Sequence, residues 1–165
     1  MEFQFKEEQY GWGDRFYIYN DQNERVYRAN STVMLLSKKM IVRDLDKNEV
    51  LTIKNEPKSL LKPRYYIIKD GRTVATVTKE FSPLIPKITI EGVDWKMRGV
   101  MWREYEMLQG EQEVFSMHME TTGWGYRPCL KIAPMADPLT ALGVAMTITF
   151  LFNMNESEKG STDHL

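Results

Sequence analysis

The fold is decided by one stretch near the C-terminus, Asp137-Pro138-Leu139-Thr140-Ala141-Leu142-Gly143-Val144-Ala145-Met146-Thr147-Ile148-Thr149-Phe150-Leu151-Phe152-Asn153. Proline suits the first position of a helix, and the preceding aspartate can cap its free N–H groups, which predicts a helix over about residues 138–152. No charged residue occurs between Asp137 and Glu156. Because apolar side chains surround this helix without leaving a polar face, we expect it to be buried on every side.

A membrane span is the rival interpretation of this helix. Fifteen residues reach only about 22 Å at about 1.5 Å each, whereas a bilayer core is about 30 Å thick. Thr140, Thr147 and Thr149 also dilute the hydrophobicity, although their hydroxyls can bond to helical carbonyls. We therefore expect no transmembrane span and favour a helix threaded through a closed β-barrel, which has no free sheet edges.

The rest of the chain is typical of antiparallel strands. Runs rich in β-branched and aromatic residues recur between turn signals. Asp70-Gly71 is the strongest of these signals, because this dipeptide readily supplies the positive φ angles of a two-residue hairpin turn. The expected strands cover residues 15–19, 25–29, 39–43, 50–54, 65–69, 73–79, 87–91, 95–99, 104–108, 113–120 and 126–132.

Length and composition indicate one domain. The chain has 165 residues, 42% of them hydrophobic, and a net charge of -1. We expect the domain to span residues 1–153 and to be followed by a polar, disordered tail at 154–165. The single cysteine, Cys129, cannot form an internal disulfide, and the N-terminus lacks a secretory pattern, so we expect a cytoplasmic protein.

Several motifs along the chain occur together: Trp12-Gly13-Asp14-Arg15-Phe16, Lys79-Glu80-Phe81, Pro86-Lys87-Ile88-Thr89-Ile90-Glu91-Gly92, Glu104-Tyr105, Trp124-Gly125 and the closing helix. These motifs resemble those of the LURP-one-related family, which belongs with the phospholipid scramblases to the tubby C-terminal-like superfamily. The resemblance implies a mainly β (α+β) fold, a closed antiparallel barrel of about 12 strands around one central hydrophobic helix. It also implies an anionic lipid ligand, because tubby domains bind phosphoinositide headgroups through basic residues outside the barrel.

No catalytic constellation is evident, and we expect a protein that is not an enzyme. A nucleophilic Ser or Cys needs a nearby base, and the two histidines are His118, expected on the outside of a strand, and His164 in the tail. Cys129 shares a strand face with Arg127 and Lys131, cations that could lower its pKa and make it reactive. A structural role for this cysteine is the favoured interpretation.

Metal and nucleotide sites are not predicted either. One cysteine and two distant histidines do not form a zinc pattern, so no metal and no cofactor are expected. Acidic pairs such as Asp44 with Asp46 and Glu111 with Glu113 fall in expected turns, where acidic residues are common. The Gly11-x-Gly13 pattern does not follow a strand and open a helix, so it is no phosphate loop.

The remaining signal is cationic. Between Arg25 and Arg72 the chain carries 12 Lys and Arg against 5 Asp and Glu. Such a cluster can bind anionic lipid at about 1 kcal/mol per charge, whereas nucleic-acid binders are usually basic overall, so no nucleic acid is expected. We predict a non-enzymatic module for anionic headgroups at a membrane surface, with a protein-interaction scaffold as the alternative and an unrecognised enzyme as a third. The lipid-binding candidates are Lys38, Lys39, Arg43, Lys54, Lys58, Lys62 and Arg64.

Overall fold

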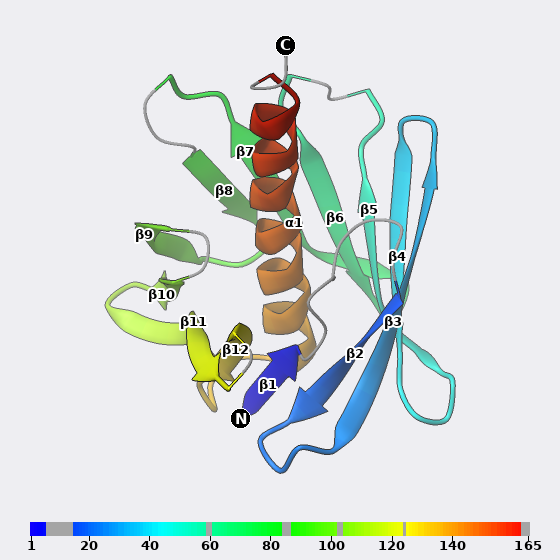
Figure 1. Cartoon of the computed structure of the whole chain (residues 1–165), viewed down its shortest axis with the longest axis vertical. Coiled ribbons are helices and arrows are strands. Elements are labelled where there is room, and N and C mark those ends of the chain that lie inside the picture. Colours follow the sequence, from blue (N-terminus) through cyan, green and yellow to red (C-terminus); the bar gives the residue numbers. More distant parts are fainter. Residues whose placement is uncertain (6–14, 59–60, 84–86, 102–103, 124, 163–165) are drawn as a thin grey trace.

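The chain forms a nearly closed antiparallel β-barrel with one helix through its centre (Figure 1). The computed structural model describes residues 1–5, 15–58, 61–83, 87–101, 104–123 and 125–162. The predicted fold class is confirmed. The elements are β1 (Glu2–Phe5), β2 (Arg15–Asn20), β3 (Arg25–Met34), β4 (Ser37–Arg43), β5 (Glu49–Asn55), β6 (Arg64–Lys69), β7 (Arg72–Glu80), β8 (Lys87–Glu91), β9 (Lys96–Met101), β10 (Glu104–Gln109), β11 (Gln112–Thr122), β12 (Gly125–Ile132) and α1 (Pro138–Thr162).

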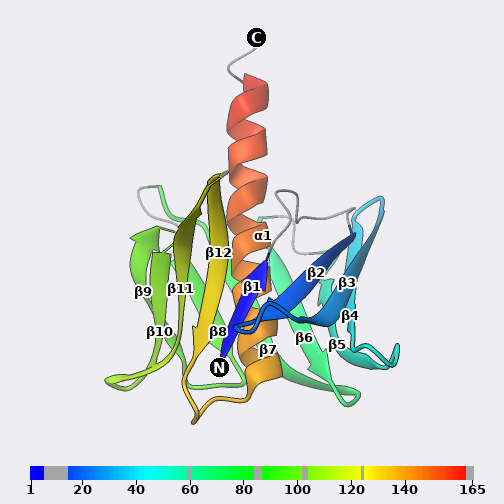
Figure 2. The same cartoon turned by 60° about the horizontal axis from the view of Figure 1, so that its bottom comes forward.

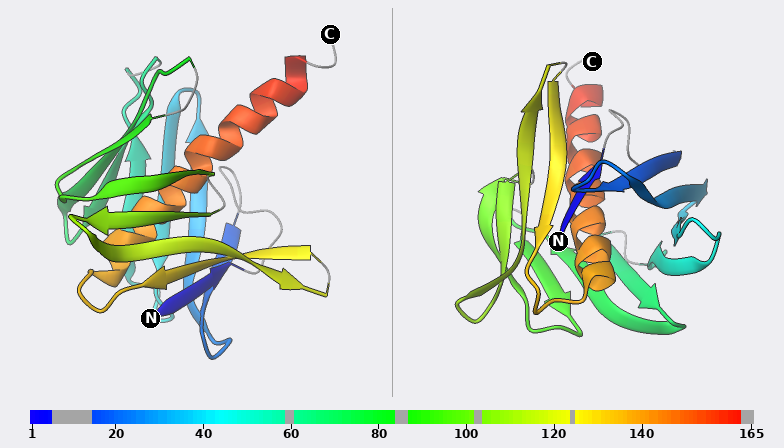
Figure 3. Two further views of the ribbon diagram at one scale, coloured as in Figure 1. Left: turned by 90° about the vertical axis from the view of Figure 1, so that its left-hand side faces the viewer. Right: turned by 90° about the horizontal axis from the view of Figure 1, so that it is seen from below.

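Every strand pairs with the next one along the chain except β8 with β9, and β1 also pairs with β12. The sheet order is β8-β7-β6-β5-β4-β3-β2-β1-β12-β11-β10-β9, so the first strand pairs with the last, Gln4 opposite Cys129. The two ends of this order, β8 and β9, approach each other around the helix. Figure 3 shows the sheet wrapped around α1, with the seam between these two strands.

Alternate residues of the strands face the helix and form the core. Phe16 and Ile18 on β2, and Ile53 on β5, are fully buried, whereas their sequence neighbours are partly or fully exposed. β1 escaped prediction because it has only four residues, but Phe3 and Phe5 place two rings in the same core. On these strands the pattern of period two therefore identifies the buried face, which points at α1.

The start of α1 follows the sequence prediction. The Thr140 N–H donates to Asp137 Oδ2 at 3.0 Å, as expected of a cap. The hydroxyls of Thr147 and Thr149 donate to the carbonyls of Gly143 and Ala145, at 2.7 and 3.0 Å. These buried threonines therefore leave no unsatisfied hydroxyl in an apolar core.

The end of α1 differs from the prediction. The sequence predicts an end at about Phe152, but the helix continues to Thr162 and projects beyond the strands (Figure 2). Residues 153–162 contain Glu, Lys and Met and no proline, and a nucleated helix extends at one hydrogen bond per residue. The division into a domain at 1–153 and a tail at 154–165 stays a prediction.

The hairpin turn at Asp70-Gly71 has the predicted backbone, because both residues have positive φ, 52° and 73°. The expected turn at residues 45–48 is also present, and Asp44 closes it by accepting hydrogen bonds from Asn48 N and Nδ2. These two bonds hold the pKa of Asp44 below its ordinary value. The Gly11-x-Gly13 pattern lies outside the described residues.

Candidate functional site

The two ends of the barrel carry different loops. Lys69, the last residue of β6, forms an ion pair with Asp137 just before α1, with Nζ and Oδ1 2.9 Å apart. The end of β6 therefore lies where the helix starts. Because neighbouring strands are antiparallel, the β3–β4, β5–β6 and β7–β8 loops lie at the opposite end, where α1 leaves the barrel (Figure 1). We call these the helix-start end and the helix-exit end.

Six of the seven predicted lipid-binding residues lie at or next to the helix-exit end. Lys39 on β4 is directly opposite Lys54 on β5. Both side chains point away from the core, because their ladder neighbours Met40 and Ile53 are fully buried and successive side chains alternate. We call the six residues the basic cluster: Lys38, Lys39, Lys54, Lys58, Lys62 and Arg64.

Arg43 is the predicted residue that the structure does not bring to this cluster. It ends β4 at the helix-start end, about 20 Å from the first residue of that strand at about 3.3 Å per residue. Its guanidinium pairs with Glu49, with Nη2 and Oε1 3.0 Å apart. Sequence proximity to Lys38 and Lys39 placed Arg43 in one group with them, but the strand carries it to the other end.

Four lysines of the basic cluster have no acidic partner in the parts of the chain that the structure describes. There, no Asp or Glu oxygen lies within 4.0 Å of Lys39, Lys54, Lys58 or Lys62 Nζ. The nearby Glu56 accepts a hydrogen bond from Tyr66 Oη at 3.1 Å instead. Positive charge is therefore available to an external anion at this end.

An exposed apolar hairpin lies beside the basic cluster. Residues 33–36, Val-Met-Leu-Leu, form the turn between β3 and β4, and we call them the apolar tip. Leu35 is 99% exposed, as fully as a side chain can be. Leu61 and Phe81, in the next two loops of the same end, are also mostly exposed. Large apolar side chains gathered at one end of a folded domain commonly mark an interaction surface.

The backbone of the apolar tip is held in place. Asn55, the last residue of β5, donates from Nδ2 to the Leu36 carbonyl at 2.7 Å and accepts from the Lys38 N–H at 2.9 Å. Leu35 has a φ of 50°, in the left-handed region that favours glycine and asparagine. A leucine in this conformation costs of order 1–3 kcal/mol and occurs where the surroundings enforce it, often at functional sites.

Sequence reasoning missed the apolar tip. It assigned strands to residues 25–29 and 39–43 and left the segment between them without a role. The available signal was a run of four apolar residues followed by Ser37-Lys38-Lys39 in a hairpin connection, where polar residues are the rule. The strands on both sides are longer than predicted, since β3 extends to Met34 and β4 begins at Ser37. Only Leu35 and Leu36 remain between them, as a two-residue turn that projects from the barrel.

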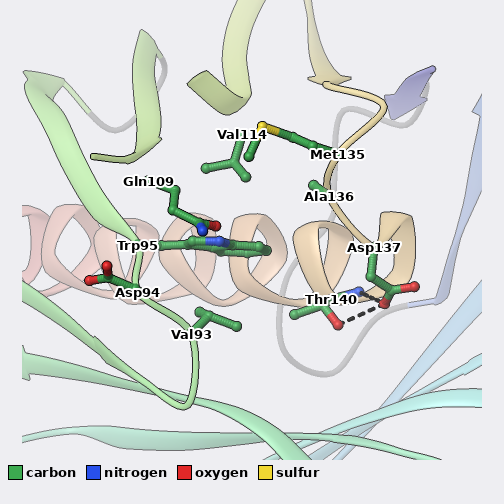
Figure 4. Close-up of a pocket in the computed structure, with 9 residues that line it drawn as sticks. All are labelled: Val93, Asp94, Trp95, Gln109, Val114, Met135, Ala136, Asp137 and Thr140. Carbon is green, nitrogen blue, oxygen red and sulfur yellow. Dashed lines mark hydrogen bonds between the residues drawn. The ribbon is translucent and has the colours of Figure 1, made fainter. Parts of the chain in front are cut away.

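The helix-start end holds a cavity of about 250 Å³ (Figure 4). Trp95 forms much of its wall and packs edge-on against Phe115, with ring centroids 5.8 Å apart. Two carboxylates line the cavity, those of Asp94 and Asp137. They lie on opposite sides of the Trp95 ring in Figure 4, so they do not form an acid–base pair.

Asp137 is occupied by the fold itself. Its Oδ2 accepts from the Thr140 N–H and from the Thr140 hydroxyl, the latter at 2.7 Å, and its Oδ1 accepts from Lys69. Burial by itself would raise the pKa of Asp137, but the hydrogen bonds from Lys69 and Thr140 outweigh it and hold the pKa below its ordinary value. Asp137 therefore caps the start of α1 and joins it to the end of β6.

His118 and Cys129 are neighbours on the outer wall of the barrel. They lie directly opposite each other on β11 and β12. His118 faces outward, as predicted. The reactive-thiolate hypothesis for Cys129 is wrong: the thiol is completely buried, and burial, together with the adjacent Glu120 carboxylate, raises its pKa to about 12. Arg127 opposes this shift only weakly.

Comparison with known proteins agrees with this fold. The sequence model of the family described as LURP-one-related matches residues 1–150. The chain belongs to the LURP-one-related family. This LURP-one-related domain is 28% identical over 159 residues to an uncharacterised protein, YxjI, of Bacillus subtilis (strain 168), covering 96% of the chain and 98% of that protein.

A solved structure shares the fold of this LURP-one-related domain. The crystal structure of a protein from Arabidopsis thaliana superposes with a TM-score of 0.62, covering 89% of this chain and 88% of the plant chain at 14% identity. Within the described residues, α1 and the rest of the chain contain no helix with the length and hydrophobicity needed to cross a bilayer.

Proposed function

We propose that this domain is a non-enzymatic module that docks on anionic lipid surfaces through its helix-exit end. The observation that carries the proposal is the juxtaposition of the apolar tip with the Lys39–Lys54 pair, which lies on the two strands directly behind it. An apolar projection backed by cations matches a membrane surface, where acyl chains lie below a layer of anionic headgroups.

The binding free energies expected from these side chains favour reversible attachment to a membrane. Moving one exposed Met or Leu side chain out of water is worth about 1.5–3 kcal/mol, so Met34, Leu35 and Leu36 together supply about 5–9 kcal/mol before ordering costs. Each lysine near an anionic surface adds about 1 kcal/mol. Neither contribution approaches that of a spanning helix, so binding depends on both and weakens with salt.

A lipid surface explains the combination of exposed apolar side chains and lysines better than a protein scaffold does. A protein interface buries apolar side chains against a partner of complementary shape, and its core is depleted of lysine. The apolar tip instead carries the flexible side chains of Met34, Leu35 and Leu36 on a projecting turn, with lysines immediately behind it. Diverging carboxylates at Asp94 and Asp137 and a buried, protonated Cys129 support the non-enzymatic part of the proposal.

Co-sedimentation of the full chain with vesicles tests the proposal. The vesicles consist of phosphatidylcholine alone, of phosphatidylcholine with phosphatidylserine, or of phosphatidylcholine with a phosphoinositide, each over a range of salt concentrations. We expect binding to the two anionic compositions that weakens with salt, and little binding to phosphatidylcholine alone. The double variant Lys39→Glu/Lys54→Glu should lose at least about 30-fold in affinity, from about 1 kcal/mol per lysine.

Lys47→Glu is the matched control. Lys47 is an exposed lysine in the β4–β5 turn at the helix-start end, so the change alters net charge without touching the basic cluster. Equal binding by the double variant and the wild type would overturn the proposal, as would indifference to the vesicle charge. An absence of vesicle binding under all conditions would leave the apolar tip to a protein partner and reject the lipid surface.

A further inference from the structure

A group of three potential metal ligands lies on the outer wall of the barrel, on the neighbouring strands β11 and β12. His118 and Glu120 are two residues apart on β11 and so share its outer face, and Cys129 lies opposite His118 on β12. Met117 and Leu130 belong to the packed core cluster, whereas Cys129 is completely buried but is not part of that cluster. A buried thiol under a histidine and a glutamate is an unusual composition for a barrel wall.

The ligand atoms are close enough for one ion. One nitrogen of His118, one oxygen of Glu120 and the sulfur of Cys129 all lie within 4.8 Å of one another, and His118 Nε2 is 3.6 Å from Glu120 Oε1. In a tetrahedral zinc site, bond lengths of about 2.0–2.3 Å place the ligand atoms about 3.3–3.6 Å apart. Side-chain rotations that move the ligand atoms by about an ångström therefore suffice to close this group around an ion.

The two oxygens of Glu120 are directed at different partners. Its Oε2 lies 3.3 Å from Arg127 Nη2, and its Oε1 faces His118. Arg127 can thus hold the carboxylate while Oε1 stays available to a metal, which is the usual function of a residue behind a metal ligand. The Arg127 backbone carbonyl also accepts the Cys129 thiol hydrogen bond, at 3.7 Å, and that proton leaves when the sulfur binds a cation.

We propose that His118, Glu120 and Cys129 bind one divalent transition-metal ion of the zinc type. A thiolate, an imidazole and a carboxylate together match zinc, whereas calcium and magnesium require oxygen ligands. Thiolate and carboxylate neutralise the two charges of the ion. Three protein ligands leave a fourth position for water or an external ligand, and His118 also lines a surface depression of about 450 Å³.

Titration of the full chain, stripped of metal with a chelator, tests this site. Zn²⁺ is added in competition with a chromophoric indicator, and Co²⁺ is added separately because a cobalt–thiolate bond gives a charge-transfer band in the near ultraviolet. We expect one tight equivalent of Zn²⁺ and a thiolate band with Co²⁺. The Cys129→Ser variant should lose the band, and its zinc affinity should fall more than about 100-fold, because even a partner behind a ligand is worth about 10–100-fold.

Further variants keep the test independent of folding. His118→Gln and Glu120→Gln change half-exposed side chains and should each weaken zinc binding while the thermal unfolding of the metal-free chain is unchanged. His164→Gln is the matched control, since it removes the other histidine of the chain. Binding that survives in His118→Gln, that disappears in His164→Gln, or that gives no thiolate band with Co²⁺ would overturn the proposal.

Discussion

Lys39 on β4 and Lys54 on β5 lie directly opposite each other in the antiparallel ladder, and both point away from the core. Like charges at such a position repel and destabilise a sheet. No acidic side chain in the described parts of the chain comes within 4.0 Å of either ammonium group to offset this repulsion. The barrel therefore keeps two repelling cations at the end where an apolar loop is exposed.

This relationship predicts opposite effects on stability and on binding. Lys54→Glu replaces a repelling cross-strand pair by an attracting one and should raise the free energy of unfolding by about 0.2–1 kcal/mol. The same variant should bind anionic vesicles more weakly than the wild type. Urea unfolding and vesicle co-sedimentation check the two effects, with Lys47→Glu as the control for net charge. A variant that lost both stability and binding would contradict the assignment, because its weak binding would then follow from poor folding.

Leu35 gives a second prediction of the same kind. Asparagine tolerates a positive φ better than leucine, so Leu35→Asn should leave the free energy of unfolding equal or raise it by up to about 1 kcal/mol. It should also weaken vesicle binding severalfold, because a buried leucine is worth about 1.5–3 kcal/mol. Leu45→Asn is the control, since Leu45 is an exposed leucine of the β4–β5 turn at the helix-start end. Equal vesicle binding by both variants would exclude insertion of the apolar tip.

The sequence determined the architecture because each of its signals is local. The uncharged stretch after Asp137, the Asp70-Gly71 turn and the alternation along the strands each depend on residues a few positions apart. The short strand β1 was missed because four residues are too few to show an alternating pattern. The end of α1 was predicted too early because residues that commonly form helices follow Phe152. Local sequence patterns predict such boundaries poorly.

The sites were less predictable because they are assembled across the ladder. The pairing of Lys39 with Lys54 depends on the register between two strands, and a shift by one residue would turn one of them inward. Cys129 and His118 are eleven residues apart, and only the β11–β12 register makes them neighbours. Proximity in sequence also misled in one case, because Arg43 lies at the opposite end of β4 from Lys38.

Gly143 packs tightly against the barrel wall and gives a third prediction. A Cβ atom at this position would come within 2.7 Å of Ile67 Cγ2 and 3.1 Å of Leu51 Cδ2. Gly143→Ala gains up to about 1 kcal/mol of helix propensity, but overpacking costs typically 1–3 kcal/mol. We expect a net loss of about 0.5–2 kcal/mol, measured by urea unfolding. The double variant Gly143→Ala/Ile67→Ala should recover part of the loss expected from the two single changes, because it removes the clashing methyl.

The cap of α1 predicts a specific dependence of stability on pH. Hydrogen bonds from Lys69 and Thr140 hold the pKa of Asp137 below its ordinary value of 3.8, despite the opposing effect of burial. A carboxyl whose pKa is lowered by folding stabilises the protein above its ordinary pKa, and this contribution is lost as the pH falls through the lowered value. Asp137→Asn keeps an N-cap acceptor but loses the charge, so it isolates the ion pair with Lys69.

At neutral pH, Asp137→Asn should reduce the free energy of unfolding by about 0.5–1 kcal/mol, the range for a partly exposed ion pair. As the pH falls below 3.8 and through the lowered pKa, the difference from the wild type should shrink towards zero, because the wild-type carboxyl becomes protonated. Lys69→Gln removes the partner from the other side and should show the same pH dependence. Urea unfolding from pH 7 to pH 2 measures all three chains. A difference that stayed constant down to pH 2 would mean that the charge of Asp137 does not stabilise the start of the helix.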